Sequence, residues 1–139
     1  MNTDKLNTSL KALIAKRQIL GELDYDDPKY DKIEEELEEM EQDFLDIYGD
    51  FLEKAIQKSH DVFCPNTDLL SPTAYIPRKY QVFNDEDLGI ESFEVGNNDG
   101  AIVDLEDFPN LEARMLLLPD PLRIVIVSAA GDQEVWRAS

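Results

Sequence analysis

The first part of the chain carries apolar residues at helical spacing. A first helix is predicted over about residues 4–20, with Thr3 or Asp4 as its cap and Gly21 in the turn after its end. The apolar face of this helix is interrupted once, by Arg17. The leucines of the face are Leu6, Leu10, Leu13 and Leu20.

A second, longer helix is predicted from Pro28 to about Ser59, with Asp27 as the cap that precedes it. Its apolar residues recur in steps of three and four, which is typical of the seam between two packed helices. The seam residues are Tyr30, Ile33, Leu37, Met40, Phe44, Ile47 and Phe51. From Leu45 onward the apolar face widens, so the second half should also pack on the rest of the chain or on another chain.

After residue 60 the pattern changes to short apolar runs separated by Gly, Pro, Asn and Asp. Strands that follow one another through short turns predict antiparallel pairing. The segment "NNDG", residues 97–100, is expected to close a hairpin between two of these strands. The run at 122–127 is apolar on both faces and should be central. The predicted strands occupy residues 74–83, 90–95, 101–105, 113–118, 122–127 and 133–138.

These patterns predict an α+β fold in a single domain over residues 1–139. A helical hairpin over residues 1–60 should pack on an antiparallel β-sheet of about five or six strands over residues 61–139. The alternative for the second helix is a homodimer, or larger homo-oligomer, in which its seam pairs with a second copy instead of the first helix.

Charge adds the strongest constraint on function. Thirteen Lys and Arg residues against 31 Asp and Glu residues give a net charge of −18. Residues 20–53 hold fifteen acids and two lysines, and residues 80–112 hold ten acids and no base. Direct binding to nucleic acid or to an anionic membrane is disfavoured, because both reward a basic surface. A basic protein partner is expected instead, and a role limited to solubility is the alternative.

The candidate partner-binding residues lie on the far side of the second helix, opposite its seam. They are Asp31, Glu35, Glu38, Glu39, Asp46 and Glu53. Trp136 is a further candidate, because Trp is enriched in binding hot spots. A packed position at the edge of the sheet is the alternative for this residue.

The sequence also bears on location. No stretch approaches the ~20 apolar residues of a membrane span, and the first residues lack the basic-then-apolar order of a secretory signal. The single cysteine, Cys64, excludes an intramolecular disulfide and fits a reducing compartment. We therefore expect a cytoplasmic protein with no membrane contact.

Several patterns in the sequence bear on metal binding or catalysis. Residues 95–106, "VGNNDGAIVDLE", match a calcium loop at four positions, but Val95 stands where the first Asp ligand is required. A turn without metal is expected there. His60 and Cys64 are the only residues of their kinds, and two ligands do not make a structural zinc site. The remaining clustered carboxylates are Asp85, Asp87, Asp104, Glu106 and Asp107.

The leading hypothesis is a non-enzymatic, acidic protein-binding module without a cofactor. An inhibitor or immunity-type protein for a basic effector, and a chaperone-like protein, are two concrete forms of it. The alternative is a metal-dependent hydrolase, which requires that several of the clustered carboxylates converge in one pocket.

Overall fold

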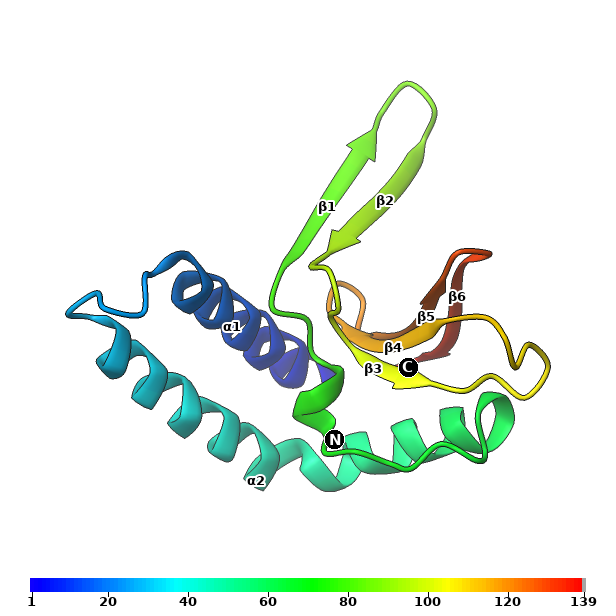
Figure 1. The fold of residues 1–139 in the computed structure, drawn as a ribbon, viewed down its shortest axis with the longest axis horizontal. Helices are drawn as coiled ribbons and strands as arrows, with labels where there is room; N and C mark the ends of the chain where they lie inside the picture. Colours follow the sequence, from blue (N-terminus) through cyan, green and yellow to red (C-terminus); the bar gives the residue numbers. More distant parts are fainter. Residues whose placement is uncertain (139) are drawn as a thin grey trace.

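The computed structural model describes residues 1–138, without the side chain of Ile90, and shows two helices followed by strands (Figure 1). The helices are α1, Thr3–Glu22, and α2, Tyr30–Phe63, and a short 3₁₀ helix, η1, spans Pro72–Tyr75. The strands are β1, Tyr80–Asp85, β2, Ile90–Val95, β3, Ala101–Val103, β4, Ala113–Leu118, β5, Arg123–Ser128, and β6, Gly131–Arg137. The predicted α+β class with a long second helix is confirmed.

The helix ends differ in detail from the prediction. The cap of α1 is Asn2, whose side chain accepts a hydrogen bond from the first turn, so the prediction of Thr3 or Asp4 is wrong. The residue before α2 is Lys29, which gives no side-chain cap. The Asp27 carboxylate instead accepts from the backbone N–H of Lys29 at 2.8 Å and fixes the turn before the helix. Within the described chain, neither helix holds a stretch long and apolar enough to cross a lipid bilayer.

The long helix α2 packs on two different neighbours along its length. In the first half, the seam residues Leu37 and Phe44 are buried in one cluster with the leucines of α1. In the second half, Leu52 is buried, and the Phe51 ring lies edge-on to the Trp136 ring of β6 with 6.1 Å between centroids. Figure 1 shows this second half running beneath the larger sheet. The first part of the seam therefore packs on α1 within one chain, and the widened apolar face packs on the β region. The predicted seam residue Ile47 is 64% exposed.

Four of the strands form one antiparallel sheet in the order β3-β4-β5-β6. Strand β5 has a neighbour on each side, as expected for a run that is apolar on both faces. Because side chains alternate along a strand, Met115, Leu117 and Ile124 join the core shared with the helices. Leu116 and Leu118 point to the other face and form a second, smaller cluster.

Strands β1 and β2 form a separate, two-stranded antiparallel sheet that we call the arm, residues 80–95. Figure 1 shows the arm standing out from the rest of the molecule. The six strands therefore form two sheets instead of the single one expected. The hairpin predicted at residues 97–100 is wrong, because this turn carries the chain from β2 in one sheet to β3 in the other. Gly100 is required there: its φ is +85°, and a Cβ would lie 2.7 Å from the carbonyl oxygen of Met115.

The base of the arm rests on the outer face of the larger sheet. Tyr80, Phe93 and Val95 pack against the second cluster. The Arg123 guanidinium lies 5.6 Å from the centroid of the Phe93 ring and donates a hydrogen bond to the Tyr80 hydroxyl at 3.2 Å. These contacts cover part of the sheet face that the helices leave open.

Candidate functional site

The six acidic candidates of α2 lie on its solvent side, and we call them the acidic face. All six side chains are exposed, and none forms an ion pair with any residue from 1 to 138. Their one side-chain hydrogen bond among these residues joins the Gln42 amide to Asp46 at 2.9 Å. From Asp31 to Glu53 the acidic face extends over about 33 Å of the helix, at ~1.5 Å per residue.

Two other acids of α2 differ because they point toward α1. Glu41 accepts from the Arg17 guanidinium at 2.9 Å. Glu36 accepts from the Lys16 ammonium, and this hydrogen bond holds the pKa of Glu36 below its usual value. The bases of α1 therefore neutralise the inner acids of α2 and leave the acidic face uncompensated.

Arg17 joins three segments of the chain. Its guanidinium donates to Glu41, to the carbonyl oxygen of Ile76 at 2.6 Å and to that of Thr73 at 3.1 Å. The side chain is only 14% exposed. Arg17 thus fixes η1 and the segment after it against both helices. In the sequence, the only sign of this buried ionic contact is that Arg17 interrupts the apolar face of the helix.

Asp99, in the turn where no metal was expected, is a buried carboxylate. Only 1% of its side-chain surface is exposed. Its carboxylate accepts from the backbone N–H groups of Gly96, Arg78 and Lys79 at 2.8, 3.0 and 3.2 Å. It also accepts from the Arg78 side chain at 3.1 Å. Because these donors lie just before β1 and just after β2, Asp99 ties both ends of the arm to the same point.

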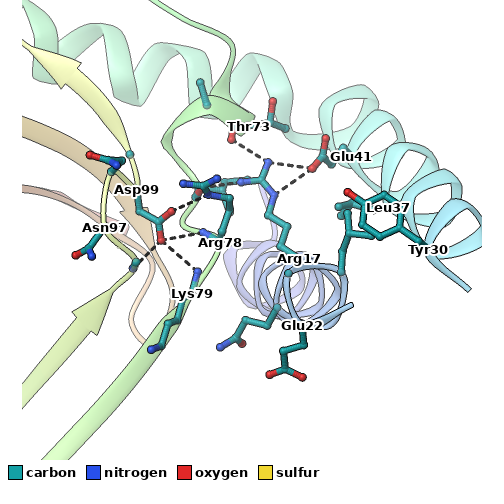
Figure 2. A pocket seen from close by; sticks show the side chains of 18 residues that line it. Arg17, Glu22, Tyr30, Leu37, Glu41, Thr73, Arg78, Lys79, Asn97 and Asp99 are labelled. Atoms are coloured by element: carbon teal, nitrogen blue, oxygen red, sulfur yellow. Dashed lines mark hydrogen bonds and ion pairs between the residues drawn. The ribbon is translucent and has the colours of Figure 1, made fainter. Parts of the chain in front are cut away.

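A cleft of about 820 Å³ lies between the end of α1, the start of α2, η1 and the turn at residues 96–100 (Figure 2). Its size is in the range of small-molecule sites. Its wall includes the apolar side chains of Leu37 and Tyr30. Its charged groups are largely paired with one another: Arg17 with Glu41, and Arg78 with Asp99. Glu22 and Lys79 also line the cleft, and neither forms an ion pair among residues 1–138.

The clustered carboxylates do not meet in one place. Asp85 ends β1 and Asp87 lies in the turn of the arm, whereas the other three follow β3. All five are exposed. Among residues 1–138, no group of three or more His, Cys, Asp or Glu side chains is arranged to hold a metal ion. The convergence that the hydrolase alternative requires is therefore not found in the described chain.

His60 and Cys64 are both buried at the end of α2. The His60 ring is hydrogen bonded through Nε2 to the Tyr75 hydroxyl at 2.9 Å and through Nδ1 to the carbonyl oxygen of Thr67 at 3.1 Å. Burial raises the pKa of the Cys64 thiol to about 11, so it is protonated at neutral pH. These residues serve packing and internal hydrogen bonding in this structure.

Trp136 is half-buried in β6 and packs against the main core. Its indole ring meets the Phe51 ring of α2, which links the sheet to the long helix. Binding of a partner by Trp136 stays a prediction. Comparison of the chain with protein-family models, with curated proteins and with solved structures found no match.

Proposed function

We propose that this chain is a non-enzymatic binding module that holds a basic partner protein through the acidic face of α2. The observation that supports this most is that six exposed carboxylates on one side of the helix form no ion pair among residues 1–138. An inhibitor or immunity-type protein for a basic effector, or a dedicated chaperone, would need such a surface.

The cost of this arrangement to the isolated chain supports the proposal. Asp31, Glu35 and Glu39 stand four residues apart along α2. Like charges at this spacing cost a helix about 0.2–0.5 kcal/mol per pair. A basic surface would remove this repulsion, and the long-range field of the acidic face would speed its approach.

A pull-down from the native lysate at about 20 mM and about 500 mM salt tests the electrostatic mechanism, because the range of charge interactions shrinks about fivefold between these concentrations. We expect a partner that is retained at low salt and lost at high salt. Recovery of no partner, or of one whose binding ignores salt, would contradict the proposal.

Two variants of equal charge separate the acidic face from the net charge. The acidic-face triple variant carries Glu35→Gln, Glu38→Gln and Glu39→Gln. The loop triple variant carries Asp104→Asn, Glu106→Gln and Asp107→Asn in the exposed segment after β3. Only the first should lose the partner. Equal losses from both would show that net charge alone governs retention.

A further inference from the structure

The arm exposes large apolar side chains beyond its packed base. Val82 is 39% exposed, Phe83 is 42% exposed and Leu88, in the turn at the tip, is 70% exposed. A two-stranded hairpin is marginally stable by itself in water, and hairpins are usually stabilised by a third strand or by packing. The outer part of the arm receives neither from the described chain.

The outer edge of β1 is open. Strand β2 pairs with one side of β1, and no strand among residues 1–138 pairs with the other side. Such an edge presents unpaired backbone N–H and C=O groups, which are a template for another strand. Val82 and Phe83 both belong to β1, so apolar side chains border this edge on both faces of the arm.

Charge decides which kind of segment can pair there. The arm carries Asp85, Glu86, Asp87, Glu91 and Glu94, and it contains no Lys or Arg. A second copy of the chain would bring another arm with five acids and no base beside this one, and like charges repel each other. Charged side chains on an edge strand are a known protection against such self-pairing. The complementary occupant is therefore a basic segment.

We propose that the open edge of β1 accepts an extended, basic segment of the partner protein as a third strand of the arm. This inference rests on the proposed function and adds the backbone contact that a charged helix face alone does not provide. In strand addition, main-chain hydrogen bonds supply affinity and alternate side chains supply specificity. The matching segment places an apolar side chain beside Phe83 and a lysine or arginine beside Asp85.

The test uses the full chain, labelled with ¹⁵N, and two synthetic peptides. The first is an acetylated and amidated heptapeptide that alternates lysine with valine. The second has the same sequence and charge, but its backbone is N-methylated at alternate residues, which blocks strand pairing. At about 20 mM salt, we expect the first peptide to shift the amides of residues 81–85 and to protect those whose N–H points away from β2. The methylated peptide should bind at least about tenfold more weakly.

A pair of variants locates the edge. Phe83→Ser should weaken binding of the first peptide about fivefold, which is the upper range for one cross-strand contact. The matched control is Ile102→Ser, because Ile102 is a 59% exposed apolar residue on β3, an edge strand of the other sheet. This control should bind the peptide normally. Loss of binding in the control, with normal binding by Phe83→Ser, would overturn the assignment to β1.

Failure of this inference and failure of the proposed function give different results. If both peptides bind equally and shift only amides along the acidic face, the arm is not the docking edge, while the proposed function stands. If the first peptide pairs with β1 but the two triple variants lose the partner equally in the pull-down, the strand pairing stands and the acidic face loses its role. If neither peptide binds at low salt, the strand-pairing inference is wrong, and the pull-down decides the proposed function separately.

Discussion

Replacement of Asp99 by alanine should separate the arm from the body. Its carboxylate accepts three backbone N–H groups, from Arg78, Lys79 and Gly96, within a site where its own side chain is almost fully buried. Hydrogen bonds to a charged group contribute about 1.5–3 kcal/mol each, and water will reach part of the emptied site. We therefore expect Asp99→Ala to lower the free energy of unfolding by about 4 kcal/mol.

Arg78→Ala is the informative comparison for this prediction. The Arg78 side chain is 67% exposed, so its ion pair with Asp99 should contribute only about 0.5 kcal/mol after solvent screening. The variant keeps the backbone N–H of residue 78. Exposed Asp104→Asn serves as the control for a change of charge and should cost less than about 0.5 kcal/mol.

The measurement is urea unfolding followed by the fluorescence of Trp136, the only tryptophan, with amide exchange recorded across the arm. In Asp99→Ala, amides of residues 80–95 should exchange faster than those of β4 and β5. The explanation would be refuted by a loss below about 1 kcal/mol, or by an equal loss in Arg78→Ala.

Three further predictions concern other internal contacts. Arg17→Met should lower the free energy of unfolding by about 3 kcal/mol, because Glu41 and two carbonyl groups lose a charged donor; a loss below about 1 kcal/mol in urea unfolding would contradict this. Cys64, with its pKa of about 11, should resist iodoacetamide at about pH 8 until urea unfolds the chain, and rapid labelling of the folded protein would contradict its burial. The hydrogen bond from Lys11 lowers the pKa of Asp120 from 3.8, so the stability from this pair should be present above about pH 4 and lost as the pH falls through the lowered pKa. Asp120→Asn should flatten that part of the acid-unfolding curve, and an unchanged curve would show that the pair contributes nothing.

The helices were predictable because their periodicity is a local property of the sequence. The seam of α2 predicted packed residues such as Phe44, although Ile47 is 64% exposed, and the widening of its apolar face after Leu45 indicated the second neighbour. The strands were located by the same logic, and successive strands pair antiparallel as predicted, except at the step from β2 to β3. Alternation says which side chains share a face, and it does not say which strand lies alongside. The turn at residues 97–100 has the composition of a hairpin and nevertheless joins two sheets.

The sequence also did not show which charged side chains are buried. Asp99 is one of 31 acids, and its type does not distinguish it from the exposed ones. Its surroundings give the clearest physical reason for its place: a Cβ on Gly96 would lie 2.7 Å from its Oδ2 atom, so the glycine lets the carboxylate close the turn. Arg17 was easier to identify as a buried charge, because a cation within a leucine face needs a partner when the face is buried. The acidic face could be placed on the solvent side of α2 from helical geometry alone.

The rate of association with the captured partner tests the central proposal most directly. It should be measured by surface plasmon resonance at about 20 mM salt for the natural chain, the acidic-face triple variant and the loop triple variant. Loss of three exposed charge contacts should weaken binding by the acidic-face variant about tenfold, mainly through slower association, while the loop variant stays close to the natural chain. Equal association rates for all three proteins would contradict a role of the acidic face in partner binding.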